Sequence, residues 1–60
     1  MCAEITREAF QVLRGDHPVQ CIYEGDFARK IYYWVYGIRL MRVENFASRT
    51  IQYYVMDINS

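Results

Sequence analysis

The amino-acid sequence predicts an α+β domain in which one N-terminal amphipathic helix packs on an antiparallel meander of three or four strands. Three observations lead to this fold class. Apolar residues near the start of the chain recur with helical spacing, the chain beyond Pro18 is rich in β-branched and aromatic residues, and short polar turns separate the apolar runs. With 60 residues, the chain has room for one small domain, spanning 1–60.

The predicted helix occupies residues 4–14, with the sequence EITREAFQVLR. Phe10 lies at the edge of its apolar stripe, Gly15 is placed to adopt the left-handed conformation that ends helices, and Pro18 prevents continuation. The stripe has the spacing i, i+4, i+7 and i+8 of one helix face and consists of Ile5, Ala9, Val12 and Leu13. We therefore expect this stripe to cover the sheet.

Two later segments have the composition of β-strands. Residues 19–24 (VQCIYE) form an apolar run that ends at the turn signal Gly25-Asp26. Residues 48–58 (SRTIQYYVMDI) are rich in β-branched and aromatic side chains and follow a polar turn. Both segments are expected to pair in the sheet.

The stretch between them, RKIYYWVYGIRLMR at residues 29–42, allows two interpretations. As a strand it has very high β-propensity, because aromatic side chains and valine are poor helix formers. As a helix at about residues 26–36, it would begin at Asp26 as N-cap and end at Gly37. We favour the strand, either one long strand bent at Gly37 or two strands joined there.

In the strand interpretation, alternate residues belong to opposite faces of the sheet. If this alternation continues through Gly37, the face covered by the helix carries Ile31, Tyr33, Val35, Met41 and Val43. The opposite face then carries Lys30, Tyr32, Trp34, Tyr36, Leu40 and Arg42. One helix can cover only one side of a sheet, so the second face, although apolar, would be left without cover.

The uncovered face suggests a binding function, because Tyr, Trp, Met and Arg are enriched at protein interfaces. The predicted partner-binding residues are Tyr32, Trp34, Tyr36, Arg42, Tyr54 and Met56. We expect a non-enzymatic protein–protein interaction module, an adaptor or inhibitor, that docks through this face or a sheet edge onto another protein or a second copy of itself. The alternative is a single-stranded nucleic-acid binder that stacks bases on Tyr and Trp beside Arg and Lys. A purely structural role, in which these rings bury in a two-sided core or cover each other across strands, is also open.

Charge and composition exclude other classes of function. Seven basic and seven acidic residues give zero net charge, which argues against binding nucleic acid or anionic lipid by long-range attraction. The single histidine, His17, has no second soft ligand nearby, so no metal is expected. No catalytic motif or cofactor-binding motif is present, and we expect neither enzymatic activity nor a cofactor.

The sequence also suggests a compartment and an oligomeric state. The first residues, MCAEITRE, are polar and charged rather than leader-like, and no apolar run approaches the roughly 18 residues of a membrane span. Cys2 and Cys21 make a poor disulfide framework, so we expect reduced thiols and a cytoplasmic location. So short a chain builds a small core, and self-association, as a homodimer for example, would add stability.

Overall fold

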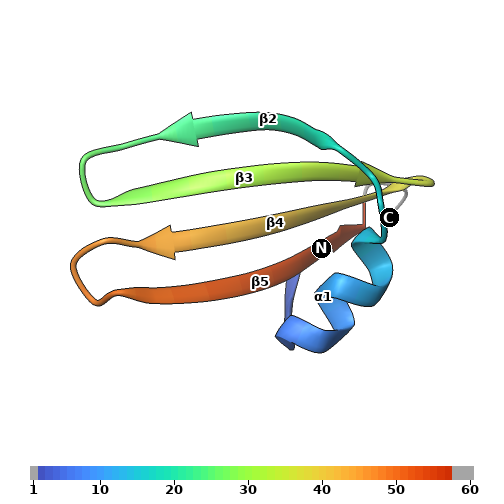
Figure 1. Cartoon of the computed structure of the whole chain (residues 1–60), viewed down its shortest axis with the longest axis horizontal. Helices are drawn as coiled ribbons and strands as arrows, with labels where there is room; N and C mark the ends of the chain where they lie inside the picture. Colours follow the sequence, from blue (N-terminus) through green and yellow to red (C-terminus); the bar gives the residue numbers. More distant parts are fainter. Residues whose placement is uncertain (1, 58–60) are drawn as a thin grey trace.

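The computed structural model describes residues 2–57 of the chain. The elements in chain order are β1 (Cys2–Ile5), α1 (Arg7–Arg14), β2 (Val19–Glu24), β3 (Ala28–Val35), β4 (Ile38–Asn45) and β5 (Thr50–Asp57). All strands join one antiparallel sheet with the order β1-β5-β4-β3-β2. The helix therefore connects the two outer strands across one face of the sheet, and it lies at the end away from the β2–β3 and β4–β5 turns (Figure 1).

The expected fold class, an N-terminal helix on a three- or four-stranded meander, is wrong. Residues 2–5 form a strand instead of the start of a helix. This strand, β1, pairs with β5 from Cys2 opposite Met56 to Ile5 opposite Tyr53, which makes the sheet five-stranded. The Thr6 side chain accepts a hydrogen bond of 3.1 Å from the N–H of Ala9 and caps the helix. Residues 2–5 are paired with β5, and Thr6 is the N-cap. The helix therefore begins at Arg7 rather than at residue 4.

The predicted apolar stripe of the helix is also wrong. The helix packs through Phe10, whose side chain is 3% exposed, with ring centroids 5.4 Å from Tyr33 and 4.7 Å from Tyr53. By contrast, Val12 is 82% exposed and Leu13 is 39% exposed. A helix of eight residues makes only about two turns, so one large side chain can provide most of its contact with the sheet.

The alternative of a second helix at residues 26–36 is wrong as well, because Ala28–Val35 is strand β3. Tyr36 and Gly37 form a two-residue turn with φ angles of 44° and 88°, the left-handed conformation of tight hairpins. This turn places Val35 opposite Ile38, so the alternation expected to continue through Gly37 is reversed in β4.

The reversal exchanges the two faces of β4. Leu40 lies opposite Tyr33 and Arg42 opposite Ile31, both on the face that α1 covers. Met41 lies opposite Tyr32, on the uncovered face with Val43. The expected assignment was therefore wrong for four residues of β4: Leu40, Met41, Arg42 and Val43.

The core lies between α1 and the covered face of the sheet. Its buried side chains form one cluster of Phe10, Ile31, Tyr33, Val35 and Leu40. Leu40 is fully buried, and Ile5, Ile38, Tyr53 and Val55 pack against the cluster. The guanidinium of Arg14 lies over the Tyr33 ring, 4.7 Å from its centre. A core of this size provides limited stability.

The thiols of Cys2 and Cys21 are free and lie on β1 and β2, at opposite edges of the sheet. Four strand spacings separate these edges, about 19 Å, whereas a disulfide requires Cα atoms within about 7 Å. We predict that titration of the unfolded protein, prepared without reductant, counts two thiols per chain. An intramolecular disulfide in that preparation would contradict the sheet order.

Candidate functional site

The face of the sheet opposite α1 is not covered by any element in residues 2–57. We call it the open face. Its central side chains follow from the strand register, since residues directly opposite each other on neighbouring strands share a face. They are Cys21, Tyr23, Lys30, Tyr32, Trp34, Arg39, Met41, Val43, Gln52, Tyr54 and Met56.

Tyr32 lies at the centre of an aromatic and cationic cluster on the open face. The Tyr23 ring meets it edge-on with a centroid separation of 5.5 Å, and the Arg39 guanidinium lies 5.6 Å from its centroid. Trp34, the direct partner of Arg39 on the neighbouring strand, is 45% exposed, and Tyr23 is 63% exposed. The cluster combines large apolar surface with a cation held against an aromatic ring, a stabilising arrangement.

The structure brings together four of the six predicted partner-binding residues. Tyr32, Trp34, Tyr54 and Met56 all lie on the open face, where Tyr54 is opposite Met41 and Met56 is opposite Arg39. These cross-strand pairs make the aromatic and methionine side chains one continuous surface.

The other two predicted residues lie elsewhere. Tyr36 is at the hairpin turn, 88% exposed, with its ring 4.9 Å from that of His17. Arg42 is on the covered face, where its Nη2 lies 3.0 Å from the carboxylate of Glu44.

Sequence reasoning missed Tyr23, Arg39 and Met41 as members of the open face. The signal that would have found Arg39 and Met41 is the Tyr36-Gly37 pair. A two-residue hairpin turn places the residues on either side of it opposite each other, and it thereby sets which side chains of β4 join Tyr32 and Trp34.

The charges on the open face are few. Lys30 and Arg39 are its cations, and Glu4 on β1, opposite Tyr54, is the acidic residue on this side of the described strands. The face is therefore mainly apolar, with a small positive excess beside the aromatic rings.

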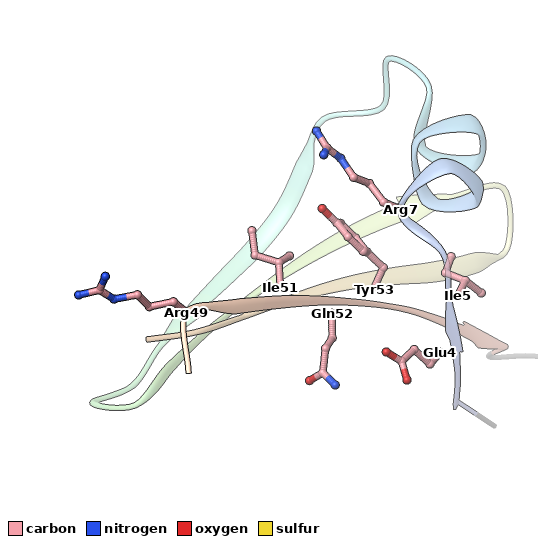
Figure 2. A pocket seen from close by; sticks show the side chains of 7 residues that line it. All are labelled: Glu4, Ile5, Arg7, Arg49, Ile51, Gln52 and Tyr53. Atoms are coloured by element: carbon pink, nitrogen blue, oxygen red, sulfur yellow. The ribbon is translucent and has the colours of Figure 1, made fainter. Parts of the chain in front are cut away.

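A groove along the edge of β5 is a second surface feature, apart from the open face (Figure 2). Strand β1 ends at Ile5, opposite Tyr53, so residues 50–52 of β5 have no partner strand on that side. The groove has a volume of about 420 Å³; Arg49 lies at one end of it and Ile5 towards the other, and Arg7 lies on the same side of the sheet as Ile51 and Tyr53. Free main-chain groups at a sheet edge can pair with another extended segment.

Residues 2–57 show no group of three His, Cys, Asp or Glu side chains placed to hold a metal ion. The helix α1 has eight residues, and no helix in this range is long and apolar enough to cross a membrane. The surfaces described above offer apolar contact, cation–π interaction and strand pairing. Comparisons with protein-family models, curated proteins and solved structures give no match for the chain.

Proposed function

We propose that the protein is a small non-enzymatic interaction module, an adaptor or inhibitor, that docks on a protein partner through the open face. The observation that carries this proposal is the concentration of aromatic, methionine and arginine side chains on a sheet face that no described element covers. These residue types dominate the binding energy of protein interfaces.

The open face has the anatomy of an interface centre. Trp34 and Tyr23 are the exposed anchors, and Tyr32 between them is already held in place by Arg39. Rings fixed in this way lose little side-chain entropy when a partner covers them. Covering the exposed half of Trp34 would remove roughly 100 Å² from water, which contributes about 2–3 kcal/mol.

The first partner to consider is a second copy of the chain. A small core leaves the domain near the limit of stability, and burying two open faces against each other would add apolar contact that the monomer lacks. The β5 edge is the weaker docking surface, because a stretch of three unpaired residues provides few main-chain hydrogen bonds. We propose a cytoplasmic location, since the two thiols are free.

The test is replacement of Trp34 with glutamate. A charge at the centre of the interface should dissociate the assembly, shift the mass measured by analytical ultracentrifugation to that of the monomer, and preserve the far-ultraviolet circular dichroism spectrum. Val12→Glu is the matched control, since it places the same charge at an exposed apolar position on α1 and should leave the assembly unchanged.

The result that would contradict protein docking is a wild-type protein that is monomeric at high micromolar concentration and captures no protein partner. Single-stranded nucleic acid is the second candidate ligand, favoured by Lys30 and Arg39 beside the rings of the open face. Saturable quenching of Trp34 fluorescence by short oligonucleotides, weakened by added salt, would replace the first function with the second.

A further inference from the structure

A hollow beneath α1 lies on the covered side of the sheet, opposite the open face. Arg7, Gln11 and Arg14 occupy helix positions i, i+4 and i+7 and so share one side of α1. They line a hollow of about 220 Å³ together with Arg42 of β4 and Tyr53 of β5. We call it the arginine pocket. Figure 2 shows the Arg7 and Tyr53 side chains on the same side of the sheet.

Three arginine residues thus line one small space in a chain whose net charge is zero. Glu44 lies 3.0 Å from Arg42, but the same carboxylate lies 2.7 Å from Arg29, so two arginines share its single negative charge. Neither Arg7 nor Arg14 forms an ion pair with an acidic side chain in the described part of the chain. The arginine pocket therefore holds an excess of positive charge.

The arginines of the pocket are held by packing and retain donors for a ligand. The Cζ atom of Arg14 lies over the Tyr33 ring, 4.7 Å from its centre. A guanidinium held in this way keeps N–H donors that an anion can use. The Nε atoms of Arg14 and Arg42 are buried and have no hydrogen-bond partner among the described residues. Buried N–H donors without partners raise the free energy of the empty pocket, and an anion that accepted hydrogen bonds from them would lower it.

We propose that the arginine pocket binds a doubly charged tetrahedral oxyanion of the phosphate class. Guanidinium forks match the oxygens of such a group in charge and geometry, and the Gln11 amide and Tyr53 hydroxyl add neutral donors. A carboxylate brings only one negative charge and leaves most of the positive excess unbalanced. The pocket and the open face lie on opposite sides of the sheet, so this site does not depend on the proposed docking function.

The experiment is calorimetric titration with sodium phosphate, sodium sulfate and sodium acetate at pH 8 and constant ionic strength. Phosphate and sulfate should bind saturably, and acetate at least about tenfold more weakly. Arg14→Gln and Arg42→Gln should each weaken phosphate binding by about tenfold or more, since each removes a charge-assisted hydrogen-bond donor.

Arg49→Gln is the matched control, because it removes the same charge from an exposed position that lines the β5 groove but not the arginine pocket. It should change phosphate binding by less than about twofold. If Arg49→Gln weakens binding as much as Arg14→Gln does, the attraction is diffuse and the pocket is not a site. Arg14→Lys keeps the positive charge but removes the forked guanidinium, so this variant should bind phosphate with intermediate affinity. It replaces Arg14→Gln in the test if Arg14→Gln does not fold.

The source of the phosphate group is separated by a second titration, with O-phosphoserine. Binding tighter than that of inorganic phosphate assigns the arginine pocket to a phosphorylated side chain, and equal binding assigns it to free phosphate. The proposal would be overturned if phosphate, O-phosphoserine and sulfate all failed to bind saturably.

Discussion

Phe10→Ala is expected to abolish the folded state at 25 °C. The Phe10 side chain is 3% exposed and contacts the rings of both Tyr33 and Tyr53, so it joins α1 to β3 and β5 at once. Truncating a buried phenylalanine typically costs about 3–5 kcal/mol of unfolding free energy. A single core in a domain of this size rarely supplies more than about 3–5 kcal/mol in total.

Urea denaturation followed by circular dichroism is the measurement. The wild type should show one cooperative transition, and Phe10→Ala should show none. Val12→Ala is the control on the same helix: Val12 is 82% exposed, so its midpoint should stay near that of the wild type. A cooperative Phe10→Ala transition at the wild-type midpoint would mean that α1 does not pack on the sheet through this ring.

Leu40→Ala is the second substitution with a large expected effect. Leu40 is the one described side chain with no exposed surface, and it lies in the middle strand of the sheet, opposite Tyr33 on β3 and Val55 on β5. Its truncation should leave a cavity and lower the free energy of unfolding by about 2–5 kcal/mol.

Met41→Ala is the matched comparison, one residue further along β4 and on the open face. Met41 is only partly buried, so its truncation should cost less than half as much as Leu40→Ala. The pair of variants reports directly on the turn at Tyr36-Gly37, because a chain that kept its alternation through the turn would reverse the two results. Equal losses would mean that both faces of β4 are core.

The sequence allowed the strands to be predicted better than the helix. Residues 19–24 coincide with β2, and the segment predicted at 48–58 contains β5. Both were predictable because β-branched and aromatic runs bounded by polar turns strongly favour strands. Residues 2–5 were missed as a strand because CAEI has no alternation of its own. Its strand conformation comes from pairing with β5, a contact that no local pattern records.

The helical stripe was misassigned for a related reason. Ile5 has helical spacing to Ala9 and Val12, yet it belongs to β1, and Thr6 separates it from the helix. Spacing shows which residues could share a face. It does not show which face the sheet will meet, and the two rings of Tyr33 and Tyr53 select Phe10.

The candidate site was predictable where it depends on one strand and not where it depends on a turn. Tyr32 and Trp34 alternate within β3 and share a face in any strand. The neighbours that β4 contributes depend on whether Tyr36-Gly37 forms a turn or a bend, a difference of one residue in register. The arginine pocket could not be predicted from the sequence, because its residues come from α1, β4 and β5 and are brought together only by tertiary packing.

The pairing of β1 with β5 has a kinetic consequence. The β2–β3, β3–β4 and β4–β5 pairs are hairpins closed by short turns, and such contacts form early because they fix little chain. Strand β1 meets β5 across almost the whole length of the sequence, and it costs the largest loop-closure entropy in the molecule. Because only Thr6 separates β1 from α1, we expect the strand and the helix to dock as one unit on a preformed meander, and we expect this late step to set the folding rate.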